Sequence, residues 1–255
     1  MKIQRERIRA SCPRLSDVEC FDCIPSTNLY ARERLSKEEL GISLFLADAQ
    51  SAGRGRLGRS FHSPSGAGVY MSLVLPLDQI RSPETLTVVA GVALCEVLEE
   101  MFPTLSPSIK WVNDIYAADK KLAGILVEGV YSASGTPYAI IGIGINCQKS
   151  AFPEELADIA TDIATCTGEA VDPAELICAL TNRLLDALES DFSAVLTAYR
   201  AHSYLLGKEV TVHPHASESY VATAHSIDAS GRLIVRLSDG TEQVLSSADV
   251  SVRKA

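Results

Sequence analysis

The chain has 255 residues, of which 47% are hydrophobic and 22% charged, enough for one full-sized core with a small second domain. Its formal net charge of −9 argues against non-specific nucleic-acid binding, which requires Lys and Arg to neutralise phosphates. No apolar run is long enough to cross a bilayer, and the basic N-terminus lacks the apolar core of a signal peptide. We therefore expect a cytoplasmic protein that does not contact a membrane.

The first part of the chain predicts two helices and two strands. Ser26 and Thr27 stand at the start of the first helix, where hydroxyl side chains are favoured as caps. Ser82 and Pro83 open the second, because proline fits the first helical position. The four elements are expected at 28–40, 42–50, 68–77 and 82–103.

Three strands then follow closely enough to form an antiparallel meander, at 108–117, 120–131 and 138–147. Several of these strands are apolar on both faces, so we expect helices to cover one side of the sheet. Asp172 begins a capping box that starts one long or two consecutive helices. From about Leu205 the chain changes to short strands, which indicate a small β-barrel or sandwich.

Residues 53–58 read GRGRLG, which has the spacing of a dinucleotide-binding fingerprint. That motif must open a helix, and Pro64 and Gly66 follow too soon for one. A P-loop is excluded too, because no Gly-Lys-Ser/Thr follows. The glycines still permit close approach to a ligand, and the arginines suit carboxylate or phosphate oxygens. The loop therefore predicts an anion clamp, with a solvated surface loop as the alternative.

A second cluster of polar residues surrounds an expected hairpin. Lys110, Asn113 and Asp114 lie near the end of one strand, and Lys121 opens the next. The hairpin should bring Lys121 close to Asp114, where the lysine could neutralise charge on a phosphate or acyl oxygen. The alternative is an ordinary salt bridge at a hairpin tip.

Two glycines alternate within the apolar strand at 140–146. Gly142 and Gly144 weaken the strand, and glycines in this setting mark places where a ligand approaches the backbone. Close packing of another protein element is the alternative.

The seven cysteines do not form a disulfide framework. Cys20 and Cys23 make a CxxC beside an expected strand, but a zinc site would need two further ligands at suitable spacing. We interpret the cysteines as small buried side chains in a reducing compartment.

In this order, five segments closely resemble the biotin protein ligases, also called biotin–[acetyl-CoA-carboxylase] ligases. The resemblance spans roughly residues 20–150, and the C-terminal strands fit the family's SH3-like domain. It implies an α+β fold, with a mixed or antiparallel sheet and packed helices as in class II synthetases. The implied domains are a catalytic domain at 1–204 and a small SH3-like β-barrel at 205–255. The segments are PSTN (25–28), AxxQSAGRGRLGRSFHSPSG (47–66), KWVNDIY (110–116), KLAGILVE (121–128) and GIGIN (142–146).

The resemblance implies an ATP-dependent ligase. Its members join biotin to ATP, giving biotinyl-5′-AMP, and pass the biotinyl group to a lysine of a carboxyl-carrier domain. The implied cofactors are ATP and Mg²⁺, the metal near Asp114 and not in a fixed protein site. A monomer or a homodimer is expected. The segment before residue 20 is too short for a winged-helix DNA-binding domain, so we expect a ligase that is not a repressor.

The resemblance also carries roles onto matching residues. Catalysis is implied for Lys121, Arg56 and Asp114. The implied biotin-binding residues are Ser26, Thr27, Asn28, Gln50, Arg54, Gly55, Arg56, Lys121, Gly124, Gly142 and Gly144. The implied ATP-binding residues are Arg59, Phe61, Lys110, Asn113 and Asn146. Two positions depart from the family pattern, with Phe61 where tryptophan is common and Val112 where proline is usual.

Three alternatives remain open from the sequence. A lipoate or octanoate ligase or transferase shares the catalytic fold, but its aliphatic ligand needs no hydrogen-bonding residues such as Ser26 and Gln50. A binding-only biotin or nucleotide sensor would lack catalysis, although Lys121, Arg56 and Asp114 are all present. The C-terminal β segment is not strongly basic and has few aromatic residues, which disfavours a nucleic-acid-binding role for it.

Overall fold

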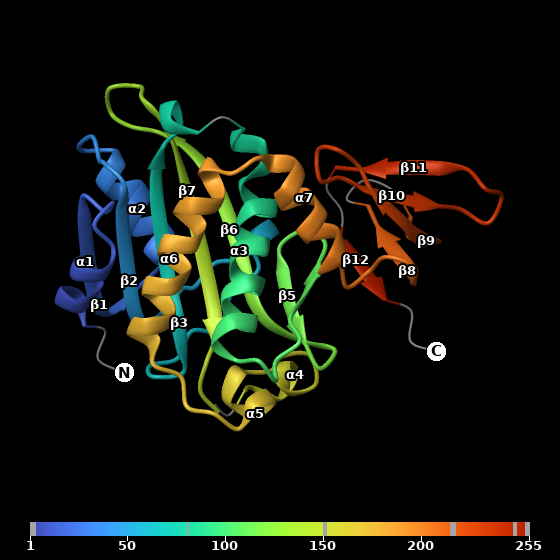
Figure 1. The fold of residues 1–255 in the computed structure, drawn as a ribbon, viewed down its shortest axis with the longest axis horizontal. Helices are drawn as coiled ribbons and strands as arrows, with labels where there is room; N and C mark the ends of the chain where they lie inside the picture. The colour runs from blue at the N-terminus through green and yellow to red at the C-terminus, as the bar shows by residue number, and fades with distance from the viewer. Residues whose placement is uncertain (1–3, 81, 150–151, 215–217, 247–248, 253–255) are drawn as a thin grey trace.

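The computed structural model describes residues 4–80, 82–149, 152–214, 218–246 and 249–252. These residues form a seven-stranded sheet and, toward the C-terminus, a five-stranded sheet (Figure 1). The strands of the larger sheet lie in the order β1-β2-β3-β7-β6-β5-β4. They are β1 (Asp17–Ile24), β2 (Ser43–Gln50), β3 (Gly68–Pro76), β4 (Ser108–Lys110), β5 (Asp114–Ala117), β6 (Lys120–Tyr131) and β7 (Pro137–Asn146).

The larger sheet is mixed, as expected. β1 and β2 run parallel, whereas the other neighbouring strands pair antiparallel. The meander predicted at 108–147 is confirmed as the run β4-β5-β6-β7. This run places segments distant in sequence side by side, because β7 also pairs with β3.

Helices pack on both faces of this sheet (Figure 1). One face is covered by α3 (Leu86–Met101), α6 (Pro173–Glu189) and α7 (Phe192–Ala201), and the other by α2 (Thr27–Leu35). The remaining helices are short. They are α1 (Arg5–Ser11), α4 (Glu154–Ala157), α5 (Ile163–Thr167) and the 3₁₀ turns η1 (Arg56–Gly58), η2 (Leu77–Gln79) and η3 (Pro83–Thr85). Within the described ranges, no helix combines the length and apolarity needed to cross a membrane.

Alternation along the central strands divides the core into two layers. In β7, Ile141, Ile143 and Ile145 pack toward α3 and α6, whereas Ile140 joins the smaller cluster beneath α2. Both layers are made of buried aliphatic and aromatic side chains. The sheet is therefore buried on both faces, which explains why its strands read as continuous apolar runs.

The strand expected over 108–117 is two strands. Residues 111–113 form a tight turn, so that Lys110 pairs with Asp114, and the Trp111–Val112 peptide bond is cis. No glycine or proline marks the reversal, and the polar residues Asn113 and Asp114 were expected near the end of one strand, so the turn was not predicted.

The expected helices are present with different ends. The first stops at Leu35, and the second begins as the 3₁₀ turn at Pro83 before α3. Asp172 caps α6, accepting hydrogen bonds from the N–H groups of Ala174 and Glu175 as predicted. The following helical segment is a separate helix, α7, which Asp191 caps.

The smaller sheet is antiparallel, in the order β11-β10-β9-β8-β12. Its strands are β8 (Glu209–His213), β9 (Tyr220–Ile227), β10 (Leu233–Arg236), β11 (Glu242–Leu245) and β12 (Asp249–Val252). Four short strands were expected after Leu205, and they correspond to β8, β9, β10 and β11. The fifth strand, β12, was not expected. The expected boundary between residues 204 and 205 stays a prediction.

The smaller sheet is anchored to the larger one through the turn between β9 and β10. Gly231 in this turn accepts a 3.0 Å hydrogen bond from the Trp111 indole nitrogen and lies against Val88 of α3. The Arg200 guanidinium donates two hydrogen bonds to the carbonyl of Ile227. The smaller sheet therefore contacts the segment that carries the predicted nucleotide residues.

Candidate active site

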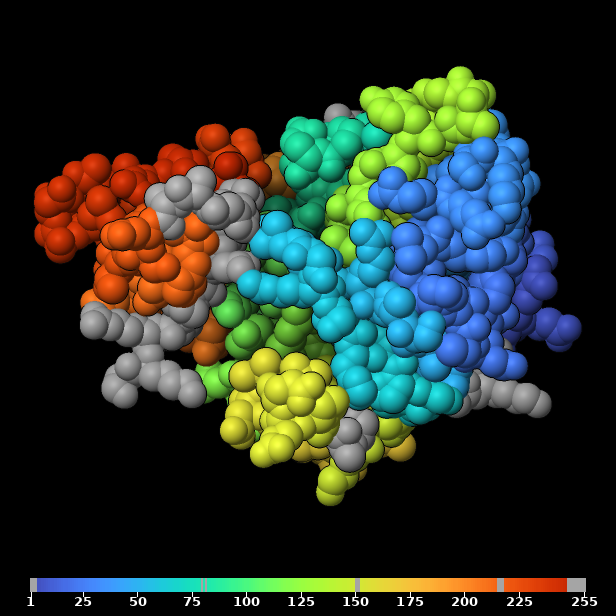
Figure 2. All heavy atoms as spheres, turned by 180° about the vertical axis from the view of Figure 1, so that it is seen from behind, coloured from blue at the N-terminus to red at the C-terminus, as the bar shows by residue number. Residues whose placement is uncertain are grey.

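A cavity of about 450 Å³ opens on the face of the larger sheet that carries α2. Figure 2 shows this face, where the cyan segment that includes the glycine–arginine loop reaches over a hollow above green strands. The cavity is lined from the start of α2, the loop at 54–61, the β4–β5 hairpin and the strands β6 and β7. The cavity thus lies where the glycine–arginine loop, the polar cluster of Lys110 to Lys121 and the alternating glycines of β7 meet.

Glycines form the floor of the cavity. Gly124 of β6 pairs with Gly144 of β7, and Gly142 lies between Ser72 of β3 and Leu126 of β6. A methyl group at position 144 would overlap the Phe61 ring, and one at position 142 would overlap the Asn28 carboxamide. The missing side chains therefore let polar and aromatic groups from other elements lie directly on the sheet.

The glycine–arginine loop is a small hairpin. The backbones of Arg54 and Ser60 form an isolated antiparallel β-bridge, and the N–H of Gly55 donates to the carbonyl of Arg59 at 2.7 Å. At its tip, Leu57 and Gly58 have φ values of 57° and 74°, in the left-handed region where glycine is favoured. After the 3₁₀ turn η1, the next element is the strand β3 and not a helix, as expected from Pro64 and Gly66, so the loop is not a dinucleotide-binding motif.

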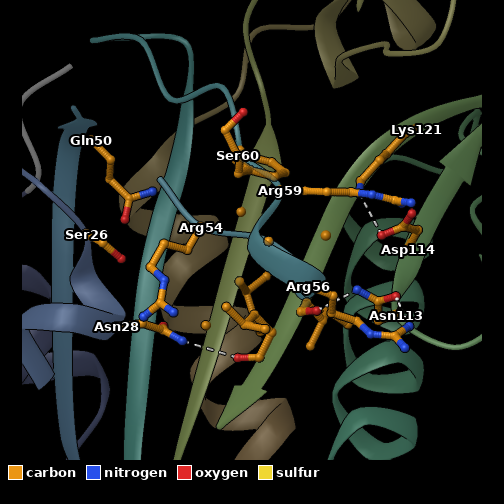
Figure 3. Close-up of a pocket in the computed structure, with 18 of the residues that line it drawn as sticks. Ser26, Asn28, Gln50, Arg54, Arg56, Arg59, Ser60, Asn113, Asp114 and Lys121 are labelled. Atoms are coloured by element: carbon orange, nitrogen blue, oxygen red, sulfur yellow. Dashed lines mark hydrogen bonds and ion pairs between the residues drawn. The ribbon is translucent and has the colours of Figure 1, made fainter. Parts of the chain in front are cut away.

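Two loop arginines, Arg54 and Arg56, which are labelled in Figure 3, have polar partners beside the cavity. Arg56 donates to the side-chain oxygen of Asn113 at 3.0 Å, and the Asn113 amide donates to the carbonyl of Ile125. Arg54 lies 3.7 Å from the Glu128 carboxylate. The loop is thereby tied to β6 and to the β4–β5 turn.

The β4–β5–β6 run brings the predicted lysine and aspartate together. Lys121 Nζ lies 2.7 Å from Asp114 Oδ1, and the two side chains are 34% and 23% exposed. Lys110 donates to the Tyr116 hydroxyl at 3.2 Å. Phe61 lies beside this cluster, with its ring centroid 6.0 Å from Lys121 Nζ.

A buried hydrogen-bond network surrounds the start of α2. The Gln50 side-chain oxygen accepts from the Thr27 N–H at 2.9 Å, and its amide nitrogen donates to Ser63 at 3.0 Å. Ser26 occupies the N-cap position, yet its hydroxyl makes no capping bond. Gln50 therefore takes the capping role, and Ser26 lines the cavity.

The cavity is strongly cationic on an acidic protein. Its described lining carries five Lys and Arg residues, whereas Asp114 supplies the one carboxylate. Cationic groups at this density favour an anionic ligand. The cations are Arg54, Arg56, Arg59, Lys110 and Lys121.

Tyr70 of β3 contacts the segment that follows the glycine–arginine loop, at Pro64. Its hydroxyl donates to the carbonyl of Pro64 at 3.0 Å. Burial raises the pKa of the Tyr70 phenol well above its usual value, so the group stays protonated as a donor.

All but one of the residues predicted for the site line this cavity. The exception is Asn146, whose side chain donates to the carbonyl of Thr161 at 3.0 Å. Their individual roles remain proposals.

Several other residues that line the cavity were not predicted from the sequence, because they belong to apolar strands or stand alone without a motif. They are Ser60, Met71, Trp111, Ile125, Leu126, Ile143 and His213.

Comparison with known proteins defines the class to which this fold and pocket belong. Residues 20–146 match the Biotin/lipoate A/B protein ligase family, and residues 205–253 match the Biotin protein ligase C terminal domain. The chain belongs to the biotin protein ligases within that class.

Relatives and solved structures agree with this placement. The chain is 32% identical to the Bifunctional ligase/repressor BirA of Bacillus subtilis, over 91% of this chain and 72% of that protein. It is 32% identical to the Biotin--[acetyl-CoA-carboxylase] ligase of Paracoccus denitrificans, over 88% of this chain and 96% of that protein. It is similar to the structure of the biotin protein ligase from Aquifex aeolicus in complex with biotin and ATP, with a TM-score of 0.80 and 28% identity. That match covers 94% of this chain and 100% of the other.

Proposed function

We propose that this protein is a biotin–[acetyl-CoA-carboxylase] ligase, which activates biotin with ATP and transfers it to a lysine of a biotin carboxyl carrier domain. The observation that carries the proposal is the cationic cavity above the glycine floor, with Lys121 and Asp114 paired at its edge. Family membership supplies the substrates, and the geometry supports a place for each.

In the first step, a biotin carboxylate oxygen attacks the α-phosphorus of ATP. A P–O bond forms there, the bond to the β-phosphate oxygen breaks, and pyrophosphate leaves with its electrons. Both reactants are anions, so the step needs cations close to the reacting oxygens. Lys121 and Arg56 would neutralise these charges, and the proximity of both to the glycine floor supports the assignment.

Biotin would lie on the floor formed by Gly124, Gly142 and Gly144, with its ureido end toward the start of α2. Ser26 and Thr27 line that end of the cavity, and polar side chains suit a polar ring, although the Thr27 hydroxyl also contacts Gln50 and Ser72. Asn28 and Gln50 are engaged by protein partners and would support this wall. Arg54 and Gly55 would belong to the loop that encloses the ligand.

The nucleotide would occupy the side of the cavity formed by the loop and the β4–β5 hairpin. Arg59 and Lys110 would face its phosphates, and Phe61 its base. Asn113 would act through its hydrogen bond with Arg56. Asn146 would face the nucleotide at the rim of the cavity. Its side chain donates a hydrogen bond to the carbonyl of Thr161, which would hold it there.

Magnesium would enter bound to ATP. Among the described residues, no group of three or more His, Cys, Asp and Glu side chains is arranged to hold a metal. Mg²⁺ is commonly bound by one or two carboxylates together with substrate phosphates, and Asp114 offers one carboxylate. When bound, the ion would neutralise phosphate charge.

In the second step, the acceptor lysine amine attacks the biotinyl carbonyl carbon of the mixed anhydride. An amide bond forms, the anhydride C–O bond breaks, and AMP leaves. Asp114 would orient the incoming amine or accept its proton. The loop over the cavity would exclude water that hydrolyses the intermediate.

The test is pyrophosphate release with ATP, Mg²⁺ and either biotin or lipoate. Release with biotin, together with biotinyl-5′-AMP identified by mass, supports the proposal. Release with lipoate alone would assign the protein to the lipoate branch of the class. Biotin binding without release would identify a sensor.

A further inference from the structure

We propose that Glu128 is a positioning residue that ties the closed end of the cavity to the glycine–arginine loop. This inference rests on the proposed function for the identity of the ligand. Glu128 is not among the residues that line the cavity and stands behind Asn28. Its side chain is 15% exposed, and a carboxylate at that depth must be well paired to be tolerated.

One carboxylate joins three elements. Its Oε2 accepts from Asn28 Nδ2 at 2.8 Å, and its Oε1 lies 3.0 Å from Arg32 and 3.7 Å from Arg54. Asn28 and Arg32 are four residues apart on one face of α2, whereas Arg54 comes from the loop. Figure 3 shows Arg54 and Asn28 directed to the same side of the cavity.

Glu128 also helps to fix which way the Asn28 amide points, together with the carbonyl of Leu126, which accepts from the same amide nitrogen at 3.4 Å. A carboxylate only accepts hydrogen bonds, so it must face the amide nitrogen. The amide oxygen is thereby directed to the Ser72 hydroxyl, which donates to it at 2.5 Å. Asn28 is 4% exposed and lies directly over Gly142, so its orientation sets the shape of the cavity's closed end.

The ion pair to Arg54 acts on the loop. Arg54 is 42% exposed and would sample many conformations without a partner. Glu128 limits it to positions beside the cavity, where it also meets an anionic ligand. Removing the charge on Glu128 should therefore loosen the Arg54 side of the loop and leave the Asn28 amide with only the weaker bond to Leu126, while the other cations of the cavity stay in place.

The testing variant is Glu128→Gln, which keeps the shape but loses the charge and can present a donor to Asn28. The matched control is Glu33→Gln, the same change on α2 at an exposed residue that pairs with Lys37. Without ligands, trypsin should cut the loop after Arg56 severalfold faster in Glu128→Gln than in the wild type. The biotin dissociation constant from calorimetry should rise about 10-fold, the effect of one hydrogen bond to a charged group. Glu33→Gln should change neither value.

Unchanged loop cleavage together with unchanged or tighter biotin binding would overturn the inference. A double-mutant cycle with Arg54→Ala guards against a general folding defect. In the Arg54→Ala background, which keeps the cleavage site after Arg56, Glu128→Gln should add little to loop cleavage. Additive effects would show that the two residues do not act together. Failure of the wild type to bind biotin would contradict the proposed function, and the cleavage result, which needs no ligand, would still decide the inference.

Discussion

Lys121 Nζ lies 2.7 Å from Asp114 Oδ1, across the β5–β6 hairpin. Strand register produces this contact, because Tyr116 pairs with Lys121 and Asp114 pairs with Gly124 on the glycine floor. The pair thus stands next to the surface on which the ligand would lie. Each partner holds the other in place before substrates arrive.

Replacing Lys121 should slow the adenylation step more than it weakens binding. Lys121→Ala removes a fixed cation from the reacting oxygens, and the rate of pyrophosphate release should fall by about 10²–10³-fold, as on loss of one oxyanion-stabilising donor. The matched control is Lys120→Ala, because the Lys120 ammonium donates to the carbonyl of Ala157 and does not line the cavity. Equal losses in both variants would refute a specific role for Lys121.

A methyl group on the cavity floor should disrupt ligand binding. Gly142→Ala would overlap the Asn28 carboxamide, which is held at both ends and yields poorly. Biotin affinity measured by calorimetry should fall. Gly129→Ala in β6 places the same methyl group where nothing lies within 4 Å, and its affinity should equal that of the wild type. Normal biotin binding by Gly142→Ala would mean that the glycine floor is not the ligand surface.

The contact between the two sheets predicts a measurable loss of stability. Gly231→Ala adds a methyl group 2.7 Å from Val88 in a residue with a φ of 79°. Gly240→Ala has the same backbone cost of about 1–2 kcal/mol for the left-handed region but meets nothing within 4 Å. Denaturant unfolding should show a larger loss for Gly231→Ala than for Gly240→Ala. Equal losses would indicate that the β9–β10 turn does not press on α3.

Acid should weaken the junction of α1 and α6. A hydrogen bond from Arg7, at 2.6 Å, is the main cause that lowers the pKa of Asp172, and the capped N–H groups of α6 contribute. The stabilisation is present above the ordinary aspartate pKa of about 3.9 and is lost as the pH falls through the lower folded value. Asp172→Asn should therefore be less stable than the wild type at neutral pH, and the difference should shrink in acid. A difference that grows in acid would contradict this sign.

Much of the site could be predicted because its residues lie in short, ordered motifs. The glycines at 142 and 144 break an apolar strand, and the arginines at 54 and 56 stand on an otherwise acidic chain. The glycines indicate close approach of a ligand to the backbone, and the arginines indicate binding of an anion. The pairing of Lys121 with Asp114 followed from the short link between their strands.

The structural supports of the site were harder to predict. Glu128 closes a network with Asn28 across elements far apart in sequence, and nothing near residue 128 signals that contact. The turn at 111–113 contains no glycine or proline, and Trp111 and Val112 favour strands, so the turn was not predicted. Tertiary pairing decided these features, and local sequence patterns do not encode it.

The most direct test of the central claim is the intact mass of an apo biotin carboxyl carrier domain after incubation with this protein, ATP, Mg²⁺ and biotin. We expect the mass to increase by one biotinyl group, on the acceptor lysine, and to stay unchanged when lipoate replaces biotin. With Lys121→Ala in place of the wild type, the same increase should appear far more slowly. An unmodified carrier, in a reaction where a known biotin ligase modifies it fully, would contradict the account.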